Sequence, residues 1–134
     1  MAEFENADAL FETIATIFAV TILLDRRQRD PELVEFVHAC MVNNHALRPG
    51  KIVGRSQILD WFERNKAKIR SSLEGADPEG FKLKLLRKIH DEALQRKVLS
   101  SIFAISVSDH ELHDEESDFI KRALDVWNTT LPRA

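Results

Sequence analysis

Apolar residues recur at spacings of three and four along most of the chain, which is the period of helices buried on one face. The first such run covers about Asn6 to Asp25 and is apolar at enough positions to indicate a central helix. No stretch alternates convincingly with period two, and Tyr is absent. The pattern predicts an all-α fold, a compact bundle of six or seven helices.

Capping and turn residues divide this pattern into elements. Asp-Pro-Glu occurs at residues 30–32 and 77–79, with Asp as the expected N-cap and Pro at the first helical position. The expected N-caps are Asp30, Ser56, Asp77, Asp91 and Asp114, and the expected helix ends lie near Asn44, Gly75, His90 and Trp127. We expect one domain over residues 1–134, with halves at about 1–47 and 56–134 joined by the turn-rich residues 43–55.

The two halves contain a repeated order of residues. Each copy has an Ile-Phe-Ala start, then an Asp, a second Asp five residues later, and a Glu two residues further on. The matching residues are Asp25, Asp30 and Glu32 in the first copy and Asp109, Asp114 and Glu116 in the second. This repeat predicts two pseudo-symmetric halves, each with an acidic corner between two helices.

The net charge of -3 is unevenly distributed. Residues 48–97 carry a balance of +6, and the two flanks together carry -9. A basic middle raises the question of nucleic acid or anionic lipid. However, the basic residues of 64–70 alternate with apolar or small ones, as on a solvated helix face. We expect no nucleic-acid binding. The basic stretches 64–70 and 82–97 remain candidates for docking an acidic protein or, peripherally, an anionic membrane.

Cysteine usage and the N-terminal residues point to the cytoplasm. Cys40 is the single cysteine, so no internal disulfide can form. The first basic residue is Arg26, and the acidic residues before it do not resemble a secretory signal. The apolar run Thr13–Leu24 is shorter than the roughly 20 residues that cross a bilayer. We interpret it as part of a buried helix.

The second acidic corner is a candidate metal site. Residues 109–116 place seven potential oxygen or nitrogen ligands within eight positions. A divalent cation would relieve the repulsion among carboxylates and take the oxygens that hard cations prefer. The candidate ligands are Asp109, Glu111, His113 and Glu116, with Asp25 and Glu32 at the first corner. At the first corner Arg26, Arg27 and Arg29 would oppose a cation.

The same acids also have a purely structural interpretation. Asp114 would cap the last helix, and acids in the first turn stabilise a helix by about 0.3–1 kcal/mol each through its dipole. An EF-hand is excluded, because Asp114 stands where Gly is required and Ile120 where a bidentate Glu is required. A closed zinc site is excluded because no Cys pair lies near His110 and His113. Metal binding and helix capping remain alternatives.

Enzymatic motifs are missing from the sequence. It contains no Gly-rich phosphate loop, no Gly-x-Ser-x-Gly elbow and no His-Glu-x-x-His. His38, His45 and His90 stand alone and suit surface or capping positions, and Cys40 suits a buried position. A general base at His113 would require a pocket around it. We expect a protein without catalytic activity.

The stretch Ala104-Ile-Ser-Val-Ser-Asp109-His110-Glu111-Leu112-His113-Asp114-Glu115-Glu116 resembles the TerB-like family, which is named for tellurite-resistance proteins. The family also includes the N-terminal part of a DnaJ-type membrane chaperone. Its pattern is an apolar helix ending near an Ala, an Asp-Gly corner, an apolar residue, and a Glu that opens a second amphipathic helix. The apolar pairs Phe119-Ile120 and Ala123-Leu124 continue the match. The chain departs from the pattern where His110 replaces Gly.

The resemblance implies an all-helical domain with pseudo-two-fold character. It also implies that Asp109 and Glu116, and in the first copy Asp25 and Glu32, bind a divalent metal. The corresponding function is a non-enzymatic module that engages a protein partner in a stress response such as tellurite resistance. The alternative is a metal-free interaction domain that uses its basic face.

Overall fold

The computed structural model describes residues 7–24, 30–108 and 113–128, and its described part is helical, with no strand among these residues. The predicted all-α fold is confirmed. The described residues form six helices: α1 (Ala7–Leu24), α2 (Asp30–Leu47), α3 (Arg55–Leu73), α4 (Pro78–Leu86), α5 (Glu92–Ser106) and α6 (Asp114–Trp127).

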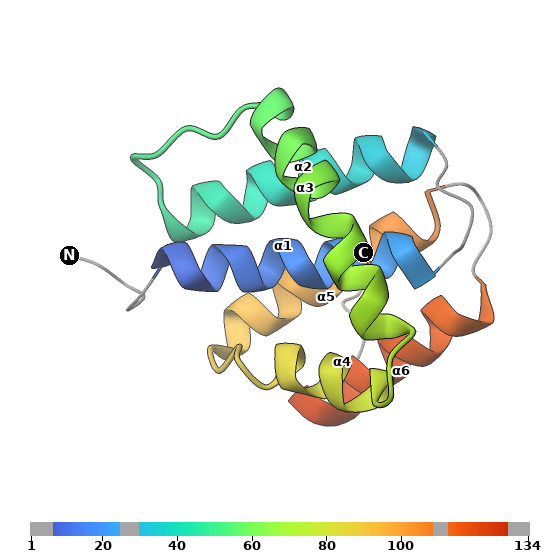
Figure 1. Cartoon of the computed structure of the whole chain (residues 1–134). Coiled ribbons are helices and arrows are strands. Elements are labelled where there is room, and N and C mark those ends of the chain that lie inside the picture. The colour runs from blue at the N-terminus through green and yellow to red at the C-terminus, as the bar shows by residue number, and fades with distance from the viewer. Residues whose placement is uncertain (1–6, 25–29, 109–112, 129–134) are drawn as a thin grey trace.

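Helix α1 is the centre around which the other helices pack (Figure 1). It contacts all five of them. Nearly every residue from Ile14 to Leu23 is buried, on all sides of the helix. A helix that is hydrophobic all round requires such a position, because no face of it gains from contact with water.

Helix α1 contains the apolar run Thr13–Leu24, which was expected to be too short for a bilayer and to form part of a buried helix. The whole helix is 18 residues long, and most of the run is buried, as predicted. By length and composition alone, α1 meets the requirement for a membrane span. However, 56% of the 18 residues of α1 are buried inside the molecule, where the helix forms the centre of the bundle.

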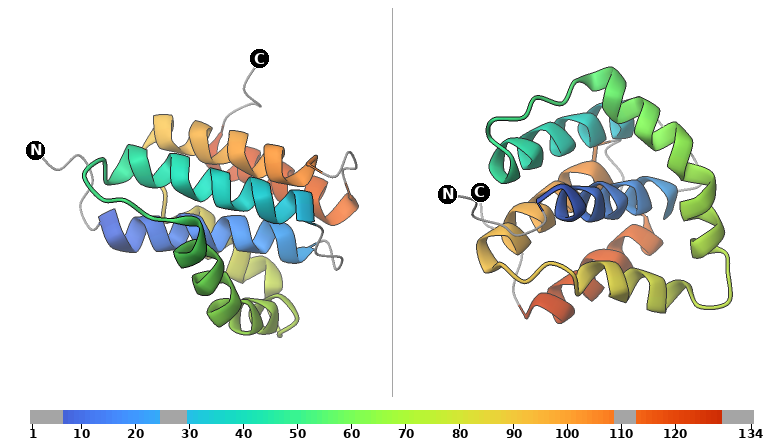
Figure 2. Two further views of the ribbon diagram at one scale, coloured as in Figure 1. Left: turned by 90° about the horizontal axis from the view of Figure 1, so that it is seen from above. Right: turned by 60° about the vertical axis from the view of Figure 1, so that its left-hand side comes forward.

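The two halves of the repeat have the same arrangement in space. Helices α1 and α5 pack side by side and run in the same direction, and α2 and α6 each return from the same end (Figures 1 and 2). Burial also follows the repeat. The buried residues Glu32, Phe36 and Ala39 of α2 match Glu116, Ile120 and Ala123 of α6. The ends of α1 and α5 and the starts of α2 and α6 therefore lie at one end of the molecule.

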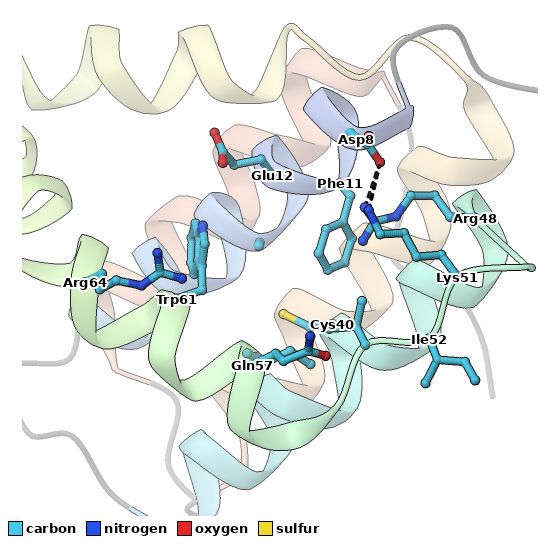
Figure 3. Close-up of a pocket in the computed structure, with 13 residues that line it drawn as sticks. Asp8, Phe11, Glu12, Cys40, Arg48, Lys51, Ile52, Gln57, Trp61 and Arg64 are labelled. Atoms are coloured by element: carbon cyan, nitrogen blue, oxygen red, sulfur yellow. Dashed lines mark hydrogen bonds and ion pairs between the residues drawn. The ribbon is translucent and has the colours of Figure 1, made fainter.

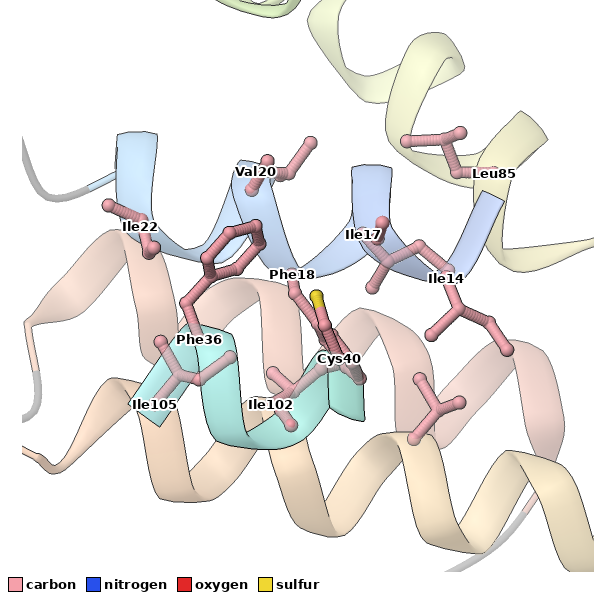
Figure 4. Close-up of a cluster of buried hydrophobic side chains, with 14 of the residues drawn as sticks. Ile14, Ile17, Phe18, Val20, Ile22, Phe36, Cys40, Leu85, Ile102 and Ile105 are labelled. Carbon is pink, nitrogen blue, oxygen red and sulfur yellow. The ribbon is translucent and has the colours of Figure 1, made fainter. Parts of the chain in front are cut away.

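The core is formed mainly by aliphatic and phenylalanine side chains around α1 (Figure 4). Phe36 of α2 and Phe62 of α3 pack with ring centroids 5.3 Å apart and an interplanar angle of 55°. At the other side of the core, the indole Nε1 of Trp127 donates a hydrogen bond of 2.9 Å to the Leu86 carbonyl. This contact joins α6 to α4. Burying one such large side chain stabilises a fold by about 1.5–3 kcal/mol.

Two of the predicted N-caps are confirmed. The carboxylate of Asp77 accepts a hydrogen bond from the Gly80 amide at 3.0 Å, and Asp91 accepts one from Leu94 at 2.8 Å. Each satisfies an amide that the first turn of a helix leaves without an intrahelical partner.

Other predicted boundaries are wrong by a few residues. The N-cap of α3 is Gly54 rather than Ser56, and that of α6 is His113 rather than Asp114. Helix α2 continues to Leu47 rather than ending near Asn44, and α4 ends at Leu86, before His90. Turn-forming Asn did not stop α2, because its side chains find partners: Asn43 Nδ2 donates to the Ala39 carbonyl at 2.8 Å.

Candidate functional site

The acidic corners place two glutamates at equivalent positions inside the fold. Glu32 lies in the first turn of α2 and Glu116 in the first turn of α6, and both are 0% exposed. Carboxylates are rarely buried to this extent, because the loss of hydration must be offset by hydrogen bonds or opposite charge. The two copies of the repeat therefore share a buried carboxylate as well as a helix start.

Glu116 takes part in the capping of α6. Its Oε1 accepts a hydrogen bond of 3.2 Å from the backbone N–H of His113, the N-cap residue. Asp114 and Glu115, in contrast, are exposed in the first turn. The N-cap role expected for Asp114 is therefore not observed. Glu116 accepts a hydrogen bond from the amide of the N-cap residue, and Asp114 and Glu115 face solvent near the positive end of the α6 dipole.

The proposed metal ligands lie only partly within the described residues. Glu32, His113 and Glu116 are described, whereas Asp25, Asp109 and Glu111 lie outside the described ranges. Within those ranges, no three His, Cys, Asp or Glu side chains are grouped so that they could hold a metal ion. The donor set of either corner therefore depends on residues 25 and 109–111 and remains a prediction.

A second candidate site is a groove between α1, α3 and the connection at residues 48–53, called here the α1–α3 groove (Figure 3). It has a volume of about 390 Å³. Its apolar lining consists of Phe11, Ala15, Cys40, Ile52, Val53, Ile58 and Trp61, and its polar rim consists of Asp8, Glu12, Arg48, Lys51, Gln57 and Arg64. The groove therefore combines an apolar floor with three basic side chains.

Arg48 contacts both an aromatic ring and polar side chains of neighbouring elements. Its guanidinium lies 4.3 Å from the centroid of the Phe11 ring, a cation–π arrangement that also buries the side chain. Nε donates a hydrogen bond of 2.8 Å to Oδ1 of Asn44, one turn earlier in α2. Only 11% of the Arg48 side chain is exposed. Its position is thus determined by contacts with both α1 and α2.

Asn44 holds the whole turn that carries these basic residues. While its Oδ1 accepts from Arg48, its Nδ2 donates a hydrogen bond of 2.8 Å to the Lys51 carbonyl. A backbone bond of 2.9 Å from the Lys51 amide to the Arg48 carbonyl closes the turn. Lys51 is therefore held on the same side of the groove as Arg48.

The carboxylate of Asp8 lies against both basic residues (Figure 3). Its Oδ1 is 2.8 Å from a terminal guanidinium nitrogen of Arg48 and 3.7 Å from Nζ of Lys51. The hydrogen bond from Arg48, and then the charge of Lys51, lower the pKa of Asp8 below its ordinary value. Asp8 is therefore ionised at neutral pH.

Cys40 contributes its sulfur to the floor of the groove (Figure 3). The residue is completely buried in the core, and burial raises the pKa of its thiol to about 12. The thiol is therefore neutral at physiological pH and is a poor nucleophile.

The basic stretches predicted as a docking face are not equally accessible. Arg64 and Lys68 are exposed on α3, in agreement with a solvated face. Lys82, however, is buried, and its Nζ lies 2.9 Å from Oε2 of Glu79. The Lys82 ammonium group is therefore paired inside the protein with Glu79. Lys97, at the end of the second stretch, lines a shallow apolar hollow with Met41 and Val42. The α1–α3 groove also places basic side chains beside an apolar surface, and there they come from Arg48, Lys51 and Arg64.

No protein-family model, curated protein or solved structure matches this chain. The TerB-like resemblance therefore remains a prediction based on its motif, and functional inference depends on the geometry of the chain itself.

The sequence interpretation missed the α1–α3 groove. It assigned residues 43–55 to a join between halves and gave Asp8 no role. The available signal was weak: Arg48 and Lys51 flank a Pro-Gly turn. Nothing in local spacing connects them to Asp8, which lies 40 residues before Arg48.

Proposed function

We propose that this chain is a non-enzymatic helical module that engages a protein partner. In this proposal the α1–α3 groove binds a segment of the partner in which an acidic side chain stands beside apolar ones. The observation that carries the proposal is the position of Arg48. A guanidinium that is nearly buried, and held by contacts with two helices, borders an apolar floor. The apolar floor suits an apolar side chain of the partner, and the guanidinium suits a carboxylate next to that side chain.

The size and lining of the groove support this proposal. Binding pockets commonly have volumes of roughly 300–1,000 Å³, with mostly apolar walls and a few polar groups that orient the ligand. The groove, at about 390 Å³, lies at the lower end of that range. It therefore suits one or two side chains of a peptide better than a large cofactor.

The chemistry of the described residues supports a binding role without catalysis. Cys40, the nucleophile nearest the groove, has a raised thiol pKa and is buried. His38, His45 and His90 are exposed on the surface and do not line the groove. The groove thus offers recognition through charge and apolar contact, and we assign it no reacting group.

The test is a selection of peptides from a random displayed library, followed by amide NMR with the most enriched synthetic peptide. We expect enriched peptides to combine Asp or Glu with an aromatic or branched apolar residue. Their addition should shift resonances of α1, residues 48–53 and α3. Affinity should fall as ionic strength rises, because part of the attraction is between charges at the surface.

A pair of variants makes this test specific. Trp61→Ala removes part of the apolar wall and should weaken peptide binding, whereas Lys84→Ala changes an exposed basic residue outside the groove and should not. The absence of enriched peptides, or shifts that cluster on another face, would show that the groove is not the binding surface.

Divalent-cation binding at the second corner is the second candidate function. The observation that favours it is the equivalence of Glu32 and Glu116, two wholly buried carboxylates at corresponding helix starts. Carboxylate oxygens are ligands of Ca²⁺, Mg²⁺ and Mn²⁺, and the imidazole of His113 would add a nitrogen ligand suited to Zn²⁺. In this proposal Asp109 and Glu111 complete the site around Glu116, and Asp25 with Glu32 forms the weaker first site.

Calorimetric titration of chelator-stripped protein with Ca²⁺, Mg²⁺, Zn²⁺ and Mn²⁺ tests this candidate. We expect saturable binding of one ion that is lost in the double variant Asp109→Asn/Glu116→Gln and retained in Asp118→Asn, an exposed acid on α6. If no ion gives heat or raises the unfolding temperature of the wild-type chain, the corners serve only as helix caps.

A stress-response role and a cytoplasmic location complete the proposal. The first is supported by the TerB-like resemblance of residues 104–116. The second is supported by the single cysteine, which is buried and takes no part in a disulfide.

A further inference from the structure

We propose that Arg48 and Lys51 form a carboxylate-binding site in the α1–α3 groove, and that Asp8 occupies this site until an acidic side chain of the partner displaces it. Asp8 would thus act as an internal competitor within the first turn of α1. This inference rests on the proposed function of the groove and identifies the chemical group that the groove recognises.

The two sides of the Asp8–Arg48 ion pair differ greatly in burial. The Arg48 side chain is 11% exposed, and the Asp8 side chain is 76% exposed. Arg48 is held by Phe11 and Asn44, whereas the described contacts of the Asp8 side chain are those with Arg48 and Lys51. The cationic side is therefore pre-organised, and the anionic side can be exchanged at little cost to packing.

The chemistry of the site favours a carboxylate. Arg48 presents a planar fork of donors that matches the two oxygens of a carboxylate, and Lys51 adds a second positive charge. Asp8 shows that a carboxylate can reach these donors: its Oδ1 lies 2.8 Å from a terminal guanidinium nitrogen of Arg48 and 3.7 Å from Nζ of Lys51. A partner side chain would bring a carboxylate to the same donors and place its apolar neighbours on other parts of the groove lining, such as Val53 and Trp61, with which Asp8 makes no described contact.

Release of Asp8 leaves its charge in a favourable position. Asp8 lies in the first turn of α1, where the helix dipole stabilises a negative charge. Asp8 would remain ionised after release, because its ordinary pKa of 3.8 is far below neutral pH. Displacement thus replaces the ion pair of Asp8 with a similar ion pair of the partner carboxylate. The net binding free energy then comes from the apolar contacts of the partner.

The experiment compares two probes that differ in charge, 2-naphthoate and its neutral analogue 2-naphthamide. Binding is followed by NMR through the Trp61 indole and the amides of residues 48–53. We expect naphthoate to bind more tightly than naphthamide to the wild-type chain. Asp8→Asn should tighten naphthoate binding by about two- to five-fold, the range expected when an exposed ion pair no longer competes.

Two further variants complete the design. Lys51→Gln, at an exposed position that does not threaten folding, should weaken naphthoate binding and leave naphthamide unchanged. Asp125→Asn, an exposed acid on α6, removes the same charge as Asp8→Asn without touching the groove and should change neither affinity. Circular dichroism confirms that each variant keeps the helical content of the wild type.

The outcomes separate the two proposals. If both probes shift the groove resonances equally and Asp8→Asn has no effect, the groove binds apolar groups but the carboxylate site is overturned. If neither probe shifts these resonances, the proposed function of the groove fails as well. Tighter naphthoate binding that appears equally in Asp125→Asn would reflect net charge alone and would also overturn the displacement by Asp8.

Discussion

The side-chain amide of Asn44 connects Arg48 to the rest of its turn: Oδ1 accepts from Arg48 Nε at 2.8 Å, and Nδ2 donates to the Lys51 carbonyl at 2.8 Å. Asn44 is itself buried. One side chain thus positions both basic residues of the α1–α3 groove and joins the end of α2 to the connection that follows.

Asn44→Ala should destabilise the protein and weaken naphthoate binding. The substitution removes two part-buried hydrogen bonds, which costs about 1–3 kcal/mol. Urea denaturation followed by circular dichroism measures the loss. Asn65→Ala is a matched control, because the Asn65 side chain makes one hydrogen bond, to the Trp61 carbonyl within the same helix. Equal effects of the two substitutions would contradict a special role for Asn44.

Glu116→Ala should destabilise the protein far more than Glu115→Ala. Glu116 is buried and accepts a hydrogen bond from the His113 amide, whereas Glu115 is exposed. We expect a loss of about 1–3 kcal/mol for Glu116→Ala, and a change within about 0.5 kcal/mol for Glu115→Ala, in the free energy of unfolding. Chemical denaturation in a chelator measures both without any contribution from metal.

Glu32→Ala extends this comparison to the first corner. Because Glu32 is also 0% exposed at the equivalent position, it should have an effect as large as that of Glu116→Ala. A small effect at Glu32 would show that the two corners are equivalent in burial but not in energy.

The buried thiol of Cys40 should make stability decrease at alkaline pH. Its pKa rises from 9.0 to about 12 on folding, so the native state retains a proton that the unfolded state loses. The stabilisation is complete below about pH 9 and is lost progressively as pH rises towards 12. Unfolding in urea between pH 8 and pH 10.5 should therefore show a steeper decline for the wild type than for Cys40→Ala.

The same burial predicts slow alkylation of Cys40. At pH 8 the native protein should react with iodoacetamide much more slowly than the urea-unfolded chain. Rapid modification of the native protein would indicate that the floor of the groove opens to solvent.

Glu79 joins α4 to α6 and should contribute to the acid dependence of stability. Its two carboxylate oxygens lie 2.9 Å from Lys82 and from Arg122. The hydrogen bond from Lys82 is the main reason that the pKa of Glu79 is lowered from 4.5. A carboxylate whose pKa is lowered in the folded state stabilises the fold at pH values above its ordinary pKa. This stabilisation is lost as the pH falls through the lowered pKa.

Glu79→Gln should therefore cost about 0.2–1 kcal/mol at neutral pH, since Glu79 is largely exposed and its pairs are screened. The difference from the wild type should decrease as pH falls below 4.5. Glu92→Gln is the control, because Glu92 pairs with Arg96 inside one helix and joins no two elements. A difference that persists at pH 3 would assign the effect to packing rather than charge.

The positions of the helices and most of the core followed from local pattern. Apolar residues at spacings of three and four predicted helices that are buried on one face, as α3 is through Ile58, Phe62 and Ile69. Asp77 and Asp91 correctly marked two helix starts. These features depend on a helix's own hydrogen bonds and on which of its faces is apolar. The candidate ligands Asp25, Asp109 and Glu111 lie outside the described residues, so that part of the prediction stands as it was made.

Contacts between distant residues were decided only by the tertiary structure. Burial of Glu32 and Glu116 was not evident from their helix-start positions, which are normally solvated, and it required other helices to cover both corners. The α1–α3 groove likewise exists because α1 brings Phe11 and Asp8 against Arg48, 40 residues later in the chain. The sequence by itself determined where helices form, since that information is local. The docking of those helices decided which charges are buried and which side chains form a binding surface.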